Sequence, residues 1–188
     1  KSTLLNILGL LDQPTSGEIY LLGQPTSQMD DQERTRLRGQ SIGFVFQFHH
    51  LIQAFSVLEN VLMPLMLVHG RPNQQAIERA HYLLEAVGLK DFAKRKASQL
   101  SGGQQQRVAI ARGLITQPAL LLADEPTGNL DSQTASEVFE LFREVNAQHE
   151  CAVLLVTHDP RLSATCDRTI NLVDGRIASD TLTTKALH

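Results

Sequence analysis

The stretch LLLADEPTGNLD, residues 120–131, decides the predicted fold. Four apolar residues run directly into Asp124 and Glu125, and Pro126 then prevents further strand pairing because proline has no N–H to donate. A short continuous apolar run of this kind is typical of a buried parallel strand. Open α/β sheets hold ligands at the carboxyl ends of their strands, so we expect the two carboxylates at the mouth of a ligand site.

The acidic pair suits metal-assisted hydrolysis. An aspartate at a strand end holds Mg²⁺, usually through water because this ion keeps its hydration shell, and the neighbouring glutamate accepts a proton from an attacking water. A buried strand that simply ends in two solvated acids has the same pattern. The interpretation of Asp124 and Glu125 therefore depends on the other motifs.

The first residues resemble the end of a phosphate-binding loop. Lys1, Ser2 and Thr3 open a segment with helical spacing of leucines, predicted as a helix over residues 2–11. In such loops the lysine meets the β- and γ-phosphates and the serine ligates Mg²⁺, while the helix N-terminus favours an anion. The glycine-rich half of the loop and an initiator methionine are absent from the sequence. We therefore expect an N-terminally truncated chain that binds ATP very weakly and does not hydrolyse it.

Composition excludes several classes of protein. A formal net charge of -3 and a pI near 6.2 give no electrostatic reason to expect nucleic acid as a partner. Cys151 and Cys166 lack metal-ligand spacing, so we expect reduced thiols. No apolar run approaches the roughly 18 to 20 residues that span a bilayer.

Periodicity predicts an α/β protein with an inserted helical subdomain. We expect a core of residues 1–47 and 118–188 and a helical subdomain over residues 48–117, because few β-branched runs occur between residues 56 and 100. Predicted strands cover residues 17–22, 41–46 and 152–156, and a hairpin about Asp174-Gly175 joins residues 168–173 to 176–178. Predicted helices include residues 30–38 and an amphipathic helix over residues 132–148.

Gln47 follows the second predicted strand and opens a loop with Phe48, His49, His50 and Leu51. A glutamine amide accepts from a water on Mg²⁺ and donates elsewhere, which suits a sensor of bound nucleotide, although a plain surface residue is the alternative. The paired histidines lack nearby metal ligands. We therefore interpret residues 48–51 as a loop that faces a partner.

The stretch LSGGQ, residues 100–104, places Ser101 at the start of a predicted helix. Gly102 and Gly103 lie in its first turn, where each glycine costs about 1 kcal/mol relative to alanine. This cost favours a close approach of the backbone to another group, and the free N–H groups favour phosphate, although a capped helix alone is the simpler reading. One nucleotide does not require two such sites in one chain, so the pattern predicts a homodimer.

His158 follows the predicted strand 152–156, again at a carboxyl end. From there it can reach the γ-phosphate or the Glu125 carboxylate. A histidine that caps the next helix is the alternative.

These motifs, in this order and over nearly the whole chain, resemble the nucleotide-binding subunits of ABC transporters. The resemblance implies a P-loop NTPase with a RecA-like parallel sheet, and it implies ATP and Mg²⁺ as cofactors. By resemblance Glu125 is the catalytic base, His158 the switch histidine, and Gln47 the residue that couples the site to a membrane partner and senses the metal. The implied contacts are Lys1, Ser2 and Thr3 with phosphates, Ser2 and Asp124 with Mg²⁺, Ser101, Gly102, Gly103 and Gln104 with the γ-phosphate of the opposite subunit, and Asp131 with the dimer seam.

Within this family, QFHHL at residues 47–51 and ENVLMPL at residues 59–65 are most similar to ATPases of lipoprotein-releasing systems. That similarity implies permease subunits bound through Phe48, His49, His50 and Leu51, at the cytoplasmic face of a bacterial inner membrane. Related ATPases of cell division and of macrolide or peptide export are the alternatives. ATPases of DNA repair and chromosome organisation carry long coiled coils or zinc modules between the two halves, and the short cysteine-free segment between Gln47 and Ser101 disfavours them.

Overall fold

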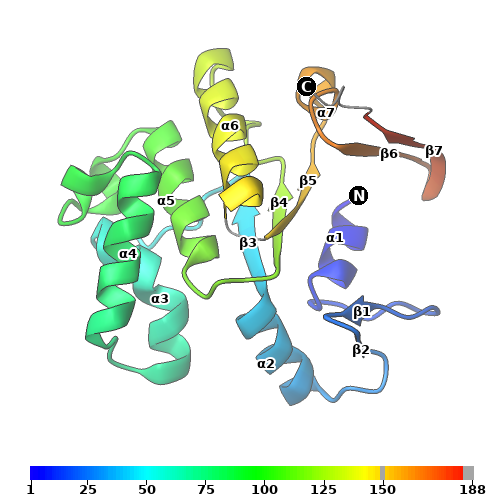
Figure 1. Cartoon of the computed structure of the whole chain (residues 1–188), viewed down its shortest axis with the longest axis horizontal. Coiled ribbons are helices and arrows are strands. Elements are labelled where there is room, and N and C mark those ends of the chain that lie inside the picture. The colour runs from blue at the N-terminus through cyan, green and yellow to red at the C-terminus, as the bar shows by residue number, and fades with distance from the viewer. Residues whose placement is uncertain (149–150, 184–188) are drawn as a thin grey trace.

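The computed structural model describes residues 1–148 and 151–183 and is built around a three-stranded parallel sheet (Figure 1). The strands are β3 (Ile42–Phe46), β4 (Leu120–Asp124) and β5 (Ala152–Val156), in the order β3-β4-β5. The register pairs Asp124 with both Phe46 and Val156, so the three strands end level with one another. The chain segments that follow the strands therefore leave from one edge of the sheet.

The central strand β4 is buried on both faces, as its continuous apolar run predicts. Leu121, Leu122 and Ala123 have no exposed surface. Helix α6 (Ser132–Gln148) returns the chain from β4 to β5, and its bounds and those of β5 agree with the prediction. The apolar stripe of α6 is buried, as predicted, and comprises Ala135, Val138, Phe139, Phe142 and Val145, with Leu141 in addition.

Helix α1 (Ser2–Leu8) packs on the face of the sheet opposite to α6. It is shorter than the predicted helix over residues 2–11. The chain leaves the helix because Leu10 takes a left-handed backbone conformation with φ of 55°. Gly9 lies against the sheet, where a Cβ atom would be 2.7 Å from the Phe44 ring. Leu10 is thereby buried in a second apolar cluster with Leu5 and Leu122.

The predicted strand over residues 17–22 is only two residues long. Strand β1 (Tyr20–Leu21) pairs with β2 (Gln24–Pro25), because Leu22 and Gly23 both have positive φ and turn the chain back at once. Helix α2 (Asp31–Ser41) follows and starts with a capping box between Asp30 and Glu33. The helix extends three residues beyond its predicted end and leads directly into β3.

The helical part contains α3 (Val57–His69), α4 (Gln74–Ala86), the 3₁₀ turns η1 (Lys90–Phe92) and η2 (Ala97–Gln99), and α5 (Gly102–Leu114). One apolar cluster runs from α3 and α4 through α5 to β4 and α6. The second half of α5 lies directly on β3, since a Cβ atom at Gly43 would be 2.2 Å from the Gly113 carbonyl oxygen. Helix α5 thus packs against both the sheet and the other helices, and the division at residues 48–117 stays a prediction.

The chain continues through α7 (Pro160–Ser163) into a hairpin of β6 (Arg168–Val173) and β7 (Arg176–Leu182). Asp174 and Gly175 both have positive φ, as the predicted two-residue turn requires. Strand β7 is longer than predicted because pairing continues to Leu182, with Asp180 bonded to Arg168 across the hairpin. The expected fraying of the tail concerns residues 184–188, which lie outside the described residues.

Both cysteines are free, as predicted, and burial raises the pKa of the Cys151 and Cys166 thiols. Within residues 1–148 and 151–183, none of the helices has the length and apolar character needed to cross a membrane.

Candidate functional site

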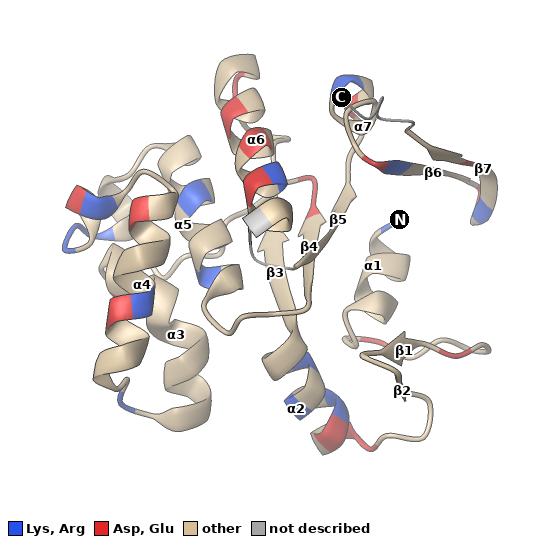
Figure 2. Ribbon diagram, in the orientation of Figure 1, with Lys and Arg blue, Asp and Glu red and all other residues tan. Residues whose placement is uncertain are grey.

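The sheet edge gathers four of the predicted site residues. Gln47 directly follows β3, Glu125 directly follows β4, and His158 follows β5 with Thr157 between them. The Lys1 ammonium donates a hydrogen bond to the Thr157 carbonyl oxygen at 3.3 Å, which brings the start of α1 to the same edge. Figure 2 shows acidic residues where β4 ends. The edge therefore combines a cation, a carboxylate, an amide and an imidazole.

Glu125 is held in a left-handed backbone conformation with φ of 46°. Its N–H donates to the Val156 carbonyl oxygen at 2.9 Å, and its own carbonyl accepts from the Gly128 N–H at 3.0 Å. A positive φ at a residue other than glycine costs about 1 to 3 kcal/mol, and such strain gathers at active sites. Here the two backbone bonds hold the turn that places the Glu125 side chain against the end of β5.

The Glu125 carboxylate meets His158, as predicted. Its Oε1 lies 3.2 Å from His158 Nε2, and its Oε2 accepts a hydrogen bond from the His158 backbone N–H at 3.3 Å. Within the described chain Oε1 is buried and has no hydrogen-bond partner, so the imidazole is close but not aligned as a donor. The Glu125 side chain is 19% exposed and that of His158 is 78% exposed. One carboxylate oxygen is therefore free to accept a proton beside a solvent-exposed imidazole.

Asp124, Ser2 and Gln47 are suited to magnesium bound together with a nucleotide. Asp124 is the last residue of β4, and Ser2 is the first residue of α1. Among the residues described, no three His, Cys, Asp or Glu side chains come together as a metal site. Mg²⁺ is commonly held by one or two carboxylates with phosphate and water oxygens, so this sparse set of oxygen donors fits the ion.

Gln47 is bonded to a residue that the sequence analysis did not identify. Its Nε2 donates to Asn129 Oδ1 at 3.1 Å, across 82 residues of sequence. Gly128 makes this approach possible, since a Cβ atom there would be 2.8 Å from Gln47 Nε2. The glycine and asparagine that follow the DEPT segment are the only sequence signal for this contact.

The LSGGQ segment is a capped helix start. Ser101 accepts from the Gln104 N–H at 3.3 Å, and the Gln104 side chain accepts from the Ser101 N–H at 3.0 Å. Gly103 is explained by packing within the chain, because a Cβ atom there would be 2.4 Å from the Thr134 methyl group. At Gly102 a Cβ atom would meet only Leu130, at 3.8 Å. The steric argument for a close external contact therefore applies to Gly102 and not to Gly103.

Asp131 caps α6 beside the same turn. Its carboxylate accepts from the Thr134 hydroxyl at 2.7 Å and from the Gln133 and Thr134 N–H groups at 3.1 Å each. The hydrogen bond from the Thr134 hydroxyl lowers the pKa of Asp131. Thr134 contacts both predicted dimer elements, which places Asp131 next to the LSGGQ turn in one surface region.

The predicted partner-facing loop needs one correction. Phe48 is 67% exposed and His50 is exposed, but Leu51 is only 7% exposed and belongs to the core. Its side chain packs between the loop and the helices and is not available to a partner. His49 is half-buried, and its burial, followed by the Arg112 charge, lowers the pKa of the imidazole.

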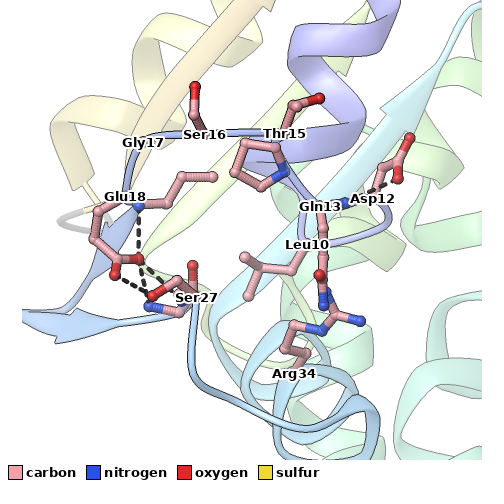
Figure 3. Close-up of a pocket in the computed structure, with 12 residues that line it drawn as sticks. Leu10, Asp12, Gln13, Thr15, Ser16, Gly17, Glu18, Ser27 and Arg34 are labelled. Atoms are coloured by element: carbon pink, nitrogen blue, oxygen red, sulfur yellow. Dashed lines mark hydrogen bonds between the residues drawn. The ribbon is translucent and has the colours of Figure 1, made fainter.

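A cavity of about 180 Å³ lies elsewhere, between the segment after α1 and helix α2 (Figure 3). It contains none of the predicted site residues. The Glu18 carboxylate in its wall accepts hydrogen bonds from the Ile19, Thr26 and Ser27 N–H groups. The Ser27 hydroxyl donates a further hydrogen bond to this carboxylate. That bond, followed by the three backbone bonds, lowers the pKa of Glu18. The group thus organises the small β1–β2 hairpin.

The chain is similar in sequence to proteins of the ABC transporter family. Residues 1–128 match the family model described as ABC transporter. The chain is 56% identical to the lipoprotein-releasing system ATP-binding protein LolD of Anaeromyxobacter dehalogenans, over 96% of this chain and 75% of that protein. It is 53% identical to LolD 1 of Rhodopseudomonas palustris, over 95% of this chain and 79% of that protein.

Solved structures give the same relationship. The chain superposes with a TM-score of 0.84 and 43% identity on the dimeric structure of MJ0796, a bacterial ABC transporter cassette, over 96% of this chain and 79% of that one. A second structure of that cassette, in a post-hydrolysis state with ADP and Pi, matches at 42% identity with the same TM-score of 0.84. The matched family model, the relatives and the residues at the strand ends all indicate the same family. This chain is an ATPase of the ABC transporter family.

Proposed function

We propose that this ATPase drives the release of lipoproteins from a bacterial inner membrane. The observation that carries the catalytic part is the strained Glu125, whose free carboxylate oxygen lies beside His158 at the carboxyl ends of three level strands. Two relatives at 56% and 53% identity are named for lipoprotein release, which supports the choice of this transport system. We place the chain at the cytoplasmic face of the membrane, as a peripheral subunit.

In this proposal each residue at the sheet edge has a separate role. Glu125 accepts the proton of the attacking water, and His158 faces the γ-phosphate from the end of β5. Lys1, Ser2 and Thr3 bind the phosphates at the start of α1. Ser2, Asp124 and Gln47 would hold Mg²⁺, which would supply positive charge to stabilise the phosphate oxygens.

We further propose that two copies assemble with Ser101, Gly102, Gly103 and Gln104 facing the nucleotide of the other copy and Asp131 at the seam. The adjacency of these residues around Thr134 and the open space at Gly102 support this arrangement. Phe48 and His50 are exposed at the start of the loop after β3, and we assign them to contact with the permease.

The permease assignment is tested by site-directed crosslinking in the full-length protein. A Phe48→Cys variant is expected to trap a membrane subunit with cytoplasmic helices. Leu67→Cys is the matched control, because Leu67 is 79% exposed but lies at the far end of α3. Capture of soluble proteins only, or equal capture from both positions, counts against the assignment.

The transport substrate needs its own test. The trapped complex is reconstituted in vesicles that hold a lipoprotein, and lipoprotein release is measured with ATP and without it. ATP-dependent release supports the proposal. Export of a macrolide or peptide by the same vesicles, without lipoprotein release, would replace it with the related transport function.

A further inference from the structure

The loop between β3 and α3, residues 47–56, contains no helix or strand. Its backbone forms a turn, with the Phe55 N–H on the Ile52 carbonyl at 3.0 Å, and a β-bridge between Ser56 and Lys96, and two buried polar side chains also fix it. Arg112 on α5 is 8% exposed and Asn60 on α3 has no exposed surface. Most buried polar side chains in proteins are hydrogen-bonded, and both of these bond to the loop backbone. Neither residue belongs to the nucleotide site described above.

Arg112 holds the first half of the loop. Its two terminal nitrogens donate to the His50 carbonyl at 2.8 Å and to the His49 carbonyl at 2.7 Å, 62 and 63 residues away in sequence. Between these two carbonyls the backbone of His50 is left-handed, with φ of 47°. In the part of the chain that the structure describes, Arg112 forms no ion pair with a carboxylate. The loop carbonyls are thus the groups that stabilise a buried guanidinium.

Asn60 holds the second half. Its Oδ1 accepts from the Ile52 N–H at 2.8 Å, and its Nδ2 donates to the carbonyl oxygens of Ile52 at 3.1 Å and Ser56 at 2.9 Å. The Asn60 amide thus makes three hydrogen bonds to the backbone of one loop, one through Oδ1 and two through Nδ2. Leu51, which lies between the two anchored parts, is buried in the core.

We propose that Arg112 and Asn60 are positioning residues that keep this loop in one preformed conformation and fasten it to helices α3 and α5. The loop then presents Phe48 and His50 without an ordering cost on binding. Helix α5 also begins at the Ser101 turn, so one helix carries both the anchor of the loop and the LSGGQ segment. The inference about the loop conformation stands without a partner, whereas its use in docking rests on the proposed function.

The conformation is tested by native-state cleavage with chymotrypsin, which cuts after Phe48, Leu51 and Phe55. Arg112→Met removes both donors without leaving a buried charge, and Arg112→Lys retains the charge but lacks the planar fork that reaches two carbonyls. The matched control is Arg79→Met. Arg79 donates to the Leu114 and Ile115 carbonyl oxygens at 2.9 and 3.0 Å, which is the same chemistry away from the loop.

We expect Arg112→Met to raise the cleavage rate within residues 48–55 about tenfold or more, as the loss of one or two charge-assisted bonds permits. Arg112→Lys is expected to lie between Arg112→Met and the parent protein, and Asn60→Leu is expected to resemble Arg112→Met. Arg79→Met reports the contribution of global destabilisation and should change cleavage in the loop much less. Equal cleavage of Arg112→Met and Arg79→Met would overturn the inference.

Docking is tested separately by combining Arg112→Lys with the Phe48→Cys crosslink. We expect a lower yield with the membrane subunit for the double variant than for Phe48→Cys alone. An unchanged yield together with faster cleavage would contradict the role in docking while the positioning role remains. If Phe48→Cys alone captures no membrane subunit, the proposed function fails, and the cleavage experiment still decides the role of Arg112.

Discussion

Two loops leave neighbouring strands at the same edge of the sheet and are held in different ways. The segment after β4, residues 125–131, is fixed locally, by the Gly128 N–H on the Glu125 carbonyl at 3.0 Å and the Leu130 N–H on the Thr127 carbonyl at 3.1 Å. The segment after β3 is fixed by Arg112 and Asn60 from two helices. The catalytic segment thus keeps its geometry mostly through backbone bonds, within itself and from the Glu125 N–H to the Val156 carbonyl of β5, whereas the exposed loop depends on side chains of the helical part.

The largest expected effect is the loss of the base from the locally fixed segment. In the full-length protein, Glu125→Gln should lower ATP turnover by about 10² to 10⁴-fold, because an amide retains the shape but cannot accept the proton. Binding of ATP should stay near that of the parent protein. Steady-state phosphate release and equilibrium nucleotide binding measure the two quantities, and near-normal hydrolysis would remove Glu125 from its role.

Loss of the Arg112 anchor from the loop after β3 should lower the free energy of unfolding. Arg112→Met removes the charged donor from the His49 and His50 carbonyls, and a hydrogen bond to a charged group contributes about 1.5 to 3 kcal/mol, so the free energy of unfolding should fall by about 2 kcal/mol. Urea denaturation of the full-length protein measures this change. Arg79→Met should give a similar loss, since it also removes a charged donor from two carbonyls, those of Leu114 and Ile115. A stability equal to that of the parent protein would show that Arg112 does not anchor the loop.

A smaller effect is expected where the two loops meet. The bond from Gln47 Nε2 to Asn129 Oδ1 is exposed, so Asn129→Ala should lower the free energy of unfolding by only about 0.5 to 1 kcal/mol. Residues 49–56 should keep their resistance to chymotrypsin, because Arg112 and Asn60 remain in place. Cleavage as fast as in Arg112→Met would mean that the two loops are held together as one unit.

The smallest effect concerns pH. The Thr134 hydroxyl lowers the pKa of Asp131, so the carboxylate stabilises the folded chain above the ordinary pKa of an aspartate. This contribution is lost as the pH falls through that ordinary range towards the lowered pKa. We expect Asp131→Asn to melt at a lower temperature than the parent protein at pH 7 and the difference to shrink in acid. A difference that is constant with pH would contradict the assigned hydrogen bond.

The sequence predicted an element correctly where a pattern within that element determines its ends. Strands β4 and β5 and helix α6 were predicted correctly, because apolar runs and a strict helical stripe mark elements that are buried on defined faces. Helix α1 and strand β1 were predicted too long. In both places a leucine, Leu10 or Leu22, takes a positive φ that leucine rarely adopts, so the residue type gives no sign that the element ends there.

The residues of the candidate site also fall into those that the sequence predicted and those that it did not. The Glu125 carboxylate was one of two groups that His158 was predicted to reach, because both residues lie just after strands of one parallel sheet. Arg112, Asn60 and Asn129 were missed, since a polar residue in an apolar helix or in a turn gives no indication of its partner. The partners of Arg112 and Asn129 lie 62 to 82 residues away. Burial of Leu51 was also missed, because a short loop has no periodicity that separates its buried side from its exposed side.

The central claim is that ATP is hydrolysed at the strand ends between Glu125 and His158, with the LSGGQ turn supplied by a second copy. A structure of full-length Glu125→Gln with Mg²⁺ and ATP tests it most directly. We predict that the γ-phosphate lies within contact of His158 and Lys1 of one copy and of Ser101 of the other. A nucleotide bound away from the carboxyl ends of β3, β4 and β5, or one that contacts Ser101 of its own chain, would contradict the account.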